Sequence, residues 1–277
     1  MQKLIISAAI TGAGTTKEMV PDVPITATEI AEETVHVVQA GAAIVHIHAR
    51  DDNGDATMDT VKFEEVYAAV QSALKREQLD AVINLTSSGA PGSDELRMAH
   101  LQKLNPDMCS LDAGTMNWAH KSVFENSPSF LDKLCDCTLQ ENIKPEIEIF
   151  DGGMMGNALH LIKIGKLKMP CHFQFVLGQL GGMPGDMQSL LYLKNMLPKG
   201  ATWSLTGIGK SHLPMLLAGL ALECTGIRVG LEDNIYYSRG IKATNVDLVE
   251  RAAQLGRLAG REIASPAEAR EILSITS

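Results

Sequence analysis

Eight short runs rich in β-branched and aromatic residues recur along the chain, and longer stretches with helical character separate them. This alternation over 277 residues is the pattern of a (β/α)8 barrel. We therefore expect an α/β protein in which residues 1–277 form a single (β/α)8 TIM barrel domain. The expected strands are 3–10, 42–50, 81–88, 108–115, 144–151, 171–178, 202–208 and 226–233. The expected helices are 26–41, 59–77, 91–103, 128–142, 153–168, 185–197, 210–224 and 244–259, with a short one from Pro266.

The main competing architecture is an open, doubly wound sheet. Such folds often carry the phosphate-binding pattern GxGxxG after the first strand. Here the segment TGAGTT, residues 11–16, has GxG but lacks the third glycine. This weak match favours the closed barrel.

Alternate residues of a barrel strand face the lumen and the surrounding helices in turn. On seven strands one of these two sets is apolar and the other is polar. A purely structural lumen is usually filled with Val, Ile and Leu, and buried polar groups cost free energy unless they are paired. We therefore expect a functional cavity. The polar set is His46, His48, Arg50, Asn84, Thr86, Ser110, Asp112, Glu146, Glu148, His172, Gln174, Ser204, Thr206, Arg228 and Glu232.

The segment VHIHARD places two histidines on one side of the second strand. His46 and His48 can present two imidazoles to one ion, and Glu232 ends the eighth strand on the lumen side. Two histidines and a glutamate suit Zn²⁺, although Mn²⁺, Ni²⁺ and Fe²⁺ also accept this set. We expect a core role for His172, which opens its strand at the far end. The remaining histidines are expected to face solvent; these are His36, His100, His120, His160 and His212.

Asp233 directly follows Glu232, so a carboxylate beside the metal site is a candidate general base. Arg228 lies one lumen layer below and can pair with Asp233, Glu146 or Glu148, either to lower a carboxylate pKa or as a structural ion pair. A polarising metal with a nearby base indicates enolate chemistry.

Loops at the ends of several strands offer further binding groups. Segments 85–89 and 113–115 provide hydroxyls and flexible backbone that suit a carboxylate or a carbonyl, or ordinary turns. The glycine-rich loop 178–186 can form a lid or part of a wide mouth.

Net charge and cysteine content narrow the class of protein. A net charge of −9 argues against nucleic acid or an anionic membrane as the main partner. No apolar run approaches the roughly 20 residues of a membrane span, and the N-terminus does not resemble a signal peptide. The five cysteines form no disulfide framework, and the pair Cys135 and Cys137 fits a helix near a turn. We expect a cytoplasmic protein with reduced thiols.

Nearly end to end, the chain resembles the β-keto acid cleavage enzymes. The resemblance implies a (β/α)8 barrel that binds Zn²⁺ through His46, His48 and Glu232. It also implies a reaction between a β-keto acid and acetyl-CoA that gives acetoacetate and a new acyl-CoA. The segments that carry it are AAITGAG, VPITATEIAEE, AGAAIVHIHARD, INLTSSG, KPEIEIFD, FVLGQLGG, GIRVGLEDN and TNVDLVERAAQLGRLAGREIASPAEAR.

The same resemblance implies roles for individual residues. Asp233, helped by Arg228 and by Glu148 rather than Glu146, removes the proton between the two carbonyl groups. The substrate carboxylate is held by positions matching Thr86, Gly89 and Thr115.

One position departs from part of the family. Where the family's aminohexanoate enzymes carry Glu, a residue suited to a substrate ammonium, this chain has Gly14. The loss of this Glu argues against an amino substrate and favours a neutral, apolar or differently charged tail. The departure therefore bears on the choice of substrate rather than on the chemistry. The resemblance also implies a homo-oligomer, often a tetramer.

Three other functions compete with this interpretation. Metal-dependent amidohydrolases also carry HxH in a barrel, but on the first strand and with later His or Lys ligands. A metal-dependent aldolase or isomerase of a small oxo acid would use a similar site. A non-catalytic, metal-bound sensor of an acyl metabolite is the third alternative.

Overall fold

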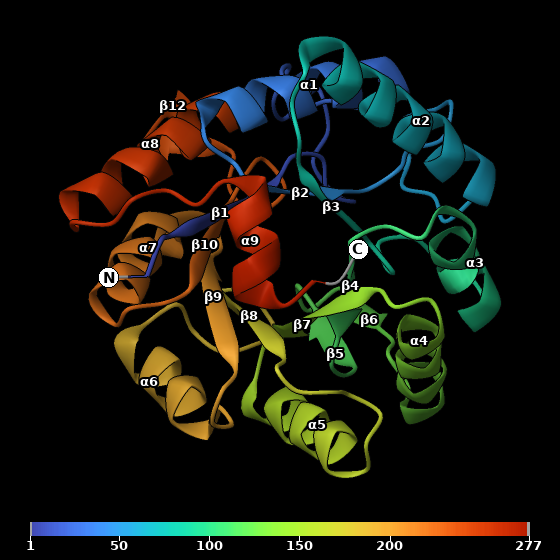
Figure 1. The fold of residues 1–277 in the computed structure, drawn as a ribbon, viewed down its shortest axis with the longest axis vertical. Coiled ribbons are helices and arrows are strands. Elements are labelled where there is room, and N and C mark those ends of the chain that lie inside the picture. The colour runs from blue at the N-terminus through green and yellow to red at the C-terminus, as the bar shows by residue number, and fades with distance from the viewer. Residues whose placement is uncertain (1, 276–277) are drawn as a thin grey trace.

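The computed structural model describes residues 2–275. Eight parallel strands close into a barrel in the ring order β1-β2-β3-β4-β7-β8-β9-β10, and helices surround it (Figure 1). The predicted barrel is confirmed, with element bounds shifted by a few residues. The barrel strands are β1 Ile5–Ala9, β2 Ile44–Ile47, β3 Val82–Leu85, β4 Met108–Asp112, β7 Lys144–Ile149, β8 His172–Leu177, β9 Thr202–Gly207 and β10 Gly226–Val229. The helices are α1 Ala27–Ala40, α2 Thr60–Glu77, α3 Asp94–Leu104, α4 Pro128–Gln140, α5 Gly152–Lys163, α6 Met187–Met196, α7 His212–Ala221, α8 Asn245–Leu258 and α9 Pro266–Leu273.

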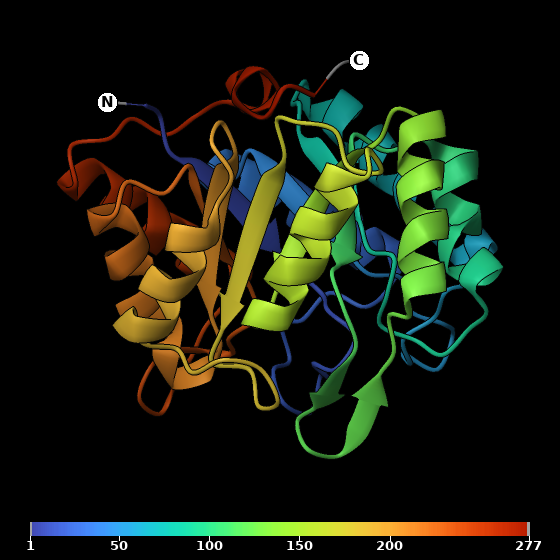
Figure 2. The same ribbon diagram turned by 90° about the horizontal axis from the view of Figure 1, so that it is seen from below.

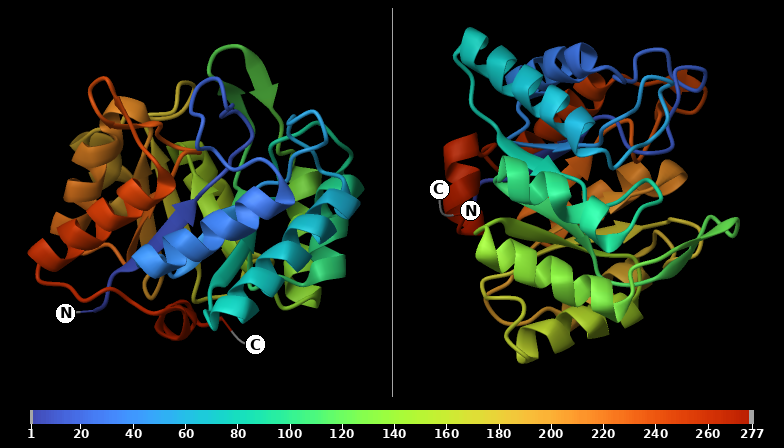
Figure 3. Two further views of the ribbon diagram at one scale, coloured as in Figure 1. Left: turned by 90° about the horizontal axis from the view of Figure 1, so that it is seen from above. Right: turned by 90° about the vertical axis from the view of Figure 1, so that its right-hand side faces the viewer.

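Two small hairpins and one short helix were not predicted. The first hairpin joins β5 Met116–Trp118 to β6 Ser122–Phe124, and the second joins β11 Tyr236–Ser238 to β12 Ile241–Lys242. The 3₁₀ helix η1 covers Gly209–Ser211. Strands of two or three residues are too short to show alternation, so periodicity cannot detect them. Figures 2 and 3 show the β5-β6 hairpin projecting from the end of the barrel opposite the chain termini.

The N-terminal end of the barrel is closed by α9, which lies across it (Figure 1). Ala269 and Leu273 pack with Ile5, Ile44, Val82 and Met108 in one apolar cluster. Arg270 fastens the helix by ion pairs to Asp80 at 2.6 Å and Asp107 at 3.0 Å. Ligands are therefore expected to enter the lumen from the other end, where the strands' C-termini and the loops that follow them gather.

The two strand faces divide as the alternation predicts. Helix-facing residues such as Ile47, Leu111 and Phe173 are fully buried in the main apolar core. The opposite residues hydrogen-bond across the lumen: Asn84 donates to Glu146 at 2.7 Å, and the Ser204 hydroxyl bonds His172 and Gln174. A polar lumen is confirmed. Some of its polar groups bond one another, whereas buried atoms such as Asn84 Oδ1, Glu146 Oε1 and Glu232 Oε2 have no hydrogen-bond partner among the described residues.

Arg50 is an exception to the parity prediction. Strand β2 ends at Ile47, so the alternation no longer fixes where Arg50 points. Its guanidinium donates to the carbonyl oxygens of Gly12, Thr15 and Gly54, each at 2.9 Å. Arg50 therefore ties together the loops that follow β1 and β2.

The prediction that five histidines face solvent is wrong for two of them. His100 is fully buried; its Nε2 lies 2.8 Å from the Thr86 carbonyl oxygen and its ring stacks on Phe63. His212 is buried against Arg251, with Nδ1 3.1 Å from Nη2. Both lie on inward-facing sides of helices. A single polar residue in a helical segment does not show which side of the helix faces the core. The core role of His172 is confirmed, since it is buried and bonds Thr202 at 2.9 Å.

All five cysteines are buried and unpaired, which agrees with reduced thiols. Cys135 and Cys137 lie in α4, as predicted. Among the described residues, none of the helices combines the length and the apolar character needed to cross a bilayer.

The buried His100 predicts an acid-sensitive contribution to stability. Burial lowers the pKa of His100 to about 4, against about 6.5 in the unfolded chain. The unfolded state therefore binds the proton first, and stability falls as pH drops from about 6.5 toward 4. His100→Gln cannot take up that proton. We expect urea denaturation to show that the wild type loses about 2 kcal/mol more than the variant between pH 7 and pH 5.

The exposed His36 offers a matched control, because His36→Gln removes a histidine from the surface. This control should follow the wild-type pH dependence. Parallel stability curves for His100→Gln and the wild type would show that His100 does not contribute to the acid sensitivity.

Candidate active site

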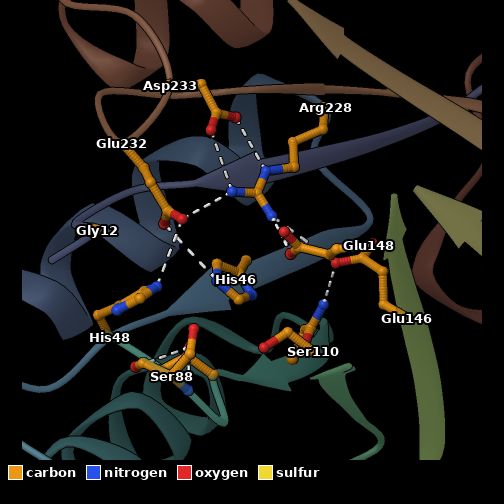
Figure 4. A network of polar contacts seen from close by, with 12 residues as sticks. Gly12, His46, His48, Ser88, Ser110, Glu146, Glu148, Arg228, Glu232 and Asp233 are labelled. Carbon is orange, nitrogen blue, oxygen red and sulfur yellow. Dashed lines mark hydrogen bonds and ion pairs between the residues drawn. The ribbon is translucent and has the colours of Figure 1, made fainter. Parts of the chain in front are cut away.

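Three predicted ligands meet at the C-terminal ends of β2 and β10, the strands that flank β1. Nε2 of His46 lies 3.7 Å from Oε2 of Glu232, and Nε2 of His48 lies 3.4 Å from Oε1 of Glu232. The three ligand atoms all lie within 4.8 Å of one another. Figure 4 shows both imidazoles directed at the glutamate. The three residues form a compact triad that can hold a metal ion.

The protonation states of His46 and Glu232 suit a cation. Burial lowers the pKa of His46 to about 3, so its imidazole is neutral and can act as a ligand. Burial opposes ionisation of Glu232, but His48 and Arg228 together hold its pKa well below the ordinary value. Oε2 of Glu232 is buried and has no hydrogen-bond partner among the described residues. A neutral imidazole with an ionised carboxylate is a usual donor set for Zn²⁺ and related divalent cations.

Arg228 connects this triad to the proposed base. Its side chain is 2% exposed. Nε donates to Asp233 at 2.9 Å, Nη1 to Glu148 at 2.8 Å and Nη2 to Glu232 at 2.7 Å. Burial opposes the charge on Arg228, but Asp233 and Glu148 raise its pKa well above the ordinary value. One guanidinium therefore fixes three carboxylates relative to one another (Figure 4).

Asp233 points into the lumen although the strand alternation alone would direct it outward. Strand β10 ends at Val229, and a turn follows in which Asp233 N donates to the Gly230 carbonyl oxygen at 3.2 Å. The turn brings Asp233 back to Arg228 and to the Thr206 hydroxyl, which donates at 3.2 Å. Burial raises the pKa of Asp233, and the charge of Arg228 opposes that rise.

The two glutamates of β7 differ in their partners. Glu148 accepts from Arg228, whereas Glu146 accepts from Asn84 and lies 3.9 Å from Arg228 Nη1. Burial raises the pKa of both, most strongly that of Glu148. Together with Glu232 and Asp233 they set four carboxylates around one guanidinium. Such an excess of buried negative charge is costly unless a cation joins it.

Two glycines allow the loops to close over the triad. Gly12 has φ +67°, and a Cβ there would lie 2.7 Å from Cγ of Glu232. Gly89 has φ +108°, and a Cβ there would lie 2.7 Å from Nδ1 of His48 and 3.1 Å from Cβ of Ala13. The loops after β1 and β3 thus meet above His48 with no room for a side chain at either position.

The other predicted substrate positions lie at the same end of the barrel. Thr86 is buried, and its hydroxyl accepts from Ser88 N at 3.0 Å. Thr115 is exposed and accepts from Asn126 N at 2.9 Å. Gly14 is exposed, and a Cβ there would have no neighbour within 4 Å. Thr86 thus adjoins the Gly89 turn, while Gly14 leaves open space.

Arg97 of α3 organises two of these loops and was not predicted. It donates to the Ser87 carbonyl oxygen at 2.8 Å, to the Glu125 carbonyl oxygen at 3.0 Å and to Asn126 Oδ1 at 2.6 Å. Its guanidinium also stacks on Phe130. Nothing in the sequence distinguishes Arg97 from an arginine on a solvent-facing side of a helix. Strand alternation did assign Asn84 and Asp112 to the lumen, but it gave them no role.

The glycine-rich loop 178–186 lies against the β5-β6 hairpin. Ala119 N of the hairpin donates to the Leu180 carbonyl oxygen at 2.9 Å, and Met183 N donates to Phe150 O at 2.8 Å. A Cβ at Gly181 would overlap Asn117 O. Backbone hydrogen bonds therefore hold this loop in place beside the hairpin.

Comparison with known proteins identifies similar chains of nearly equal length. The family model described as beta-keto acid cleavage enzyme matches residues 3–275. The 3-keto-5-aminohexanoate cleavage enzyme of Fusobacterium nucleatum subsp. nucleatum is 40% identical over 277 residues, covering 99% of both chains. The 3-oxoadipate:acetyl-CoA acetyltransferase of Cupriavidus necator is 35% identical over 282 residues, covering 100% of this chain and 96% of the relative.

Among solved structures, a ternary complex of ObcA with a C4-CoA adduct and oxalate superposes with a TM-score of 0.77. The sequences are 22% identical, and the match covers 92% of this chain and 68% of ObcA. At this identity the match supports the barrel fold alone.

The triad predicts a metal site that depends on each imidazole. Removing one of three protein ligands should greatly weaken binding of a divalent cation. We expect purified His48→Ala to contain little metal by elemental analysis and to bind added Zn²⁺ much more weakly than the wild type by calorimetry. His120→Ala, which removes an exposed histidine, is the control. Full metal occupancy of a folded His48→Ala protein would remove His48 from the ligand set.

Proposed function

Because this chain belongs to the β-keto acid cleavage enzyme family, we propose that it exchanges acyl groups between a β-keto acid and acetyl-CoA, giving acetoacetate and a new acyl-CoA. The observation that carries the proposal is the single hydrogen-bonded network joining the His46, His48 and Glu232 triad to Asp233 through Arg228. We infer that this network sets a candidate cation site next to a carboxylate that can act as a base, an arrangement that suits enolate chemistry.

His46, His48 and Glu232 are the residues that would hold the cation, and we favour Zn²⁺ for this donor set. When bound there, the cation supplies Lewis acidity toward the oxygens of the β-keto acid and stabilises negative charge in a water-poor cavity. Its positive charge also offsets the four carboxylates around Arg228.

Asp233 is our candidate for the general base that removes the proton between the two carbonyl groups. It is 7% exposed, and burial raises its pKa, which makes the carboxylate a stronger base than a solvated aspartate. Arg228 fixes the carboxylate orientation through two donors, at 2.9 and 3.1 Å. Glu148 in turn fixes Arg228 from the opposite side of the lumen.

The atoms of the exchange balance without a further reactant. The carbanion of R–CO–CH₂–COO⁻ attacks the thioester carbonyl of CH₃–CO–S–CoA and forms a new carbon–carbon bond. The carbon–sulfur bond of the resulting adduct breaks and releases CoA thiolate. CoA thiolate then adds to the R–CO carbonyl, and the bond between that carbonyl and the central carbon breaks. The products are CH₃–CO–CH₂–COO⁻ and R–CO–S–CoA, and the proton returns to the central carbon.

The loops above the triad are proposed to hold the substrate carboxylate through Thr86, Gly89 and Thr115. The positions of two of these residues support the proposal. Gly89 lies against His48, and the Thr86 hydroxyl accepts a hydrogen bond from the Ser88 amide in the same loop. Gly14 is proposed to border the substrate tail, where the absence of a side chain leaves space.

We also propose that the protein is a cytoplasmic homo-oligomer, with a tetramer as the expected form. An uncharged outer face supports the assembly. Helix α7 contains no Asp, Glu, Lys or Arg, yet Leu213 is 38% and Leu217 is 48% exposed on it. A helix that is apolar on all sides is usually covered by a neighbour.

The activity can be tested directly. We expect the purified, Zn²⁺-loaded protein to convert members of a panel of β-keto acids, with acetyl-CoA present, into acetoacetate and the matching acyl-CoA. Liquid chromatography with mass detection should find both products in equal amounts. Acetoacetate formation without acyl-CoA, or no reaction with any member of the panel, would contradict the proposed function.

Asp233→Asn should lower turnover about 10³-fold, since a general base typically contributes 10²- to 10⁴-fold. The amide keeps the size of the side chain but cannot take the proton. Metal content should stay at the wild-type level because Asp233 is not in the triad. Asp22→Asn changes an exposed aspartate and serves as the matched control. Near-normal turnover of metal-loaded Asp233→Asn would require a different base.

A further inference from the structure

Asn84 of β3 lies between a candidate metal ligand and a buried carboxylate. The strand register pairs Asn84 with His46 of β2, and both side chains are buried in the lumen. Nδ2 of Asn84 donates to Oε2 of Glu146, on β7, at 2.7 Å. The proposed reaction gives no task to Asn84 or to Glu146. Because burying these polar groups costs free energy, a role for them beside the triad is expected.

The tautomer of His46 decides which of its ring nitrogens can bind a cation. Nε2 lies 3.7 Å from Oε2 of Glu232, so Nε2 must keep its electron pair free if it is to be the ligand. In a neutral imidazole the other nitrogen, Nδ1, then carries the proton and needs an acceptor. Within residues 2–275, Nδ1 of His46 is buried and has no hydrogen-bond partner.

Asn84 carries the acceptor that this proton lacks. Its Oδ1 atom is buried and is also without a hydrogen-bond partner in the part of the chain that the structure describes. The Asn84 side chain is near enough to the His46 imidazole for a side-chain hydrogen bond. The unpaired donor and the unpaired acceptor therefore belong to neighbouring side chains on paired strands.

Glu146 fixes which end of the Asn84 amide is available to His46. Its Oε2 atom accepts from the NH₂ group of the amide, so the amide nitrogen is occupied and Oδ1 is left for the imidazole. With the amide reversed, its NH₂ group would face the Nδ1 proton, and two donors would oppose each other. Only one orientation of the Asn84 amide thus satisfies both neighbours.

We propose that Asn84 is a positioning residue for the metal site: its Oδ1 accepts from Nδ1 of His46, and Glu146 holds the amide in the orientation that this bond needs. The chain of contacts keeps Nε2 of His46 unprotonated and directed at the triad. The two glutamates of β7 then have different tasks, because Glu148 bonds Arg228 instead. The inference rests on the metal site of the proposed function, but not on the reaction.

Asn84→Leu tests this role through the affinity for Zn²⁺. Loss of the outer partner of a metal-binding histidine typically weakens metal binding roughly 10- to 100-fold. We expect Kd for Zn²⁺, measured by competition with a chromophoric chelator, to rise by this factor. Gln174→Leu is the matched control, since it removes a buried lumen amide that bonds Ser204 rather than the triad. Its Kd should match that of the wild type.

The thermal unfolding midpoint shows whether each variant is folded. A folded Asn84→Leu protein that binds Zn²⁺ as tightly as the wild type would overturn the proposal. Equal weakening by Asn84→Leu and Gln174→Leu would also overturn it, because a general loss of lumen packing would then account for both.

The tautomer of His46 can be read in the wild type itself, so the test does not depend on a variant that folds. In Zn²⁺-loaded protein labelled with ¹⁵N in its histidines, nuclear magnetic resonance should find the His46 ring protonated at Nδ1. The signal that is absent from His46→Gln identifies this ring. A His46 ring protonated at Nε2 in the wild type would contradict the proposed chain of contacts.

Two variants of Glu146 separate its acceptor oxygen from its charge. Glu146→Gln keeps an oxygen that can accept from Asn84, so we expect it to bind Zn²⁺ like the wild type. Glu146→Leu removes the acceptor and should shift Kd for Zn²⁺ toward the Asn84→Leu value. Equal Kd values for the two variants would show that Glu146 does not orient the Asn84 amide.

The two levels of inference fail differently. If the wild type binds no divalent cation, the proposed metal site and the role of Asn84 are both wrong. If the wild type binds Zn²⁺ and converts β-keto acids, while Asn84→Leu binds Zn²⁺ equally tightly, the proposed function stands and the role of Asn84 is wrong.

Discussion

The Arg228 guanidinium is the interaction on which the rest of the site depends. It is buried and bonds Asp233, Glu148 and Glu232 directly, so it links the metal triad to the candidate base. Removing its charge would leave several carboxylates facing one another in a lumen that excludes water, where their repulsion is weakly screened. Arginine suits this position because its planar fork reaches three acids at once and stays charged when buried.

The barrel makes this arrangement possible by closing. His46 and Glu232 are 186 positions apart in the sequence, yet they flank the same first strand because β1 pairs with both β2 and β10. The loops above the strands are then held by two arginines that face backbone carbonyl groups rather than acids. Arg50 ties the loops after β1 and β2, and Arg97 ties the loop after β3 to the segment before α4. The strand pairing thus brings the three triad residues together, and the two arginines hold the surrounding loops in place.

The barrel, its order of elements and the polar lumen could all be predicted from the sequence, because alternation and helix length report directly on which face is buried. The same alternation assigned His46, His48 and Glu232 to one side of their strands, which is where the triad forms. It failed for Arg50, which lies beyond the end of its strand, and for His100 and His212, which face inward on helices. Arg97 and the two hairpins could not be found, since their contacts depend on loops whose paths follow from tertiary packing.

Charge also explains why the acids of the lumen can lie so close together. Arg228 bonds Glu148, Glu232 and Asp233 directly, and a cation in the triad would add positive charge beside Glu232. These groups come from β2, β7, β10 and the segments that directly follow β2 and β10, so closure of the barrel brings them together. The positive charges that offset the buried carboxylates therefore also lie where the negative charge of the proposed enolate would develop.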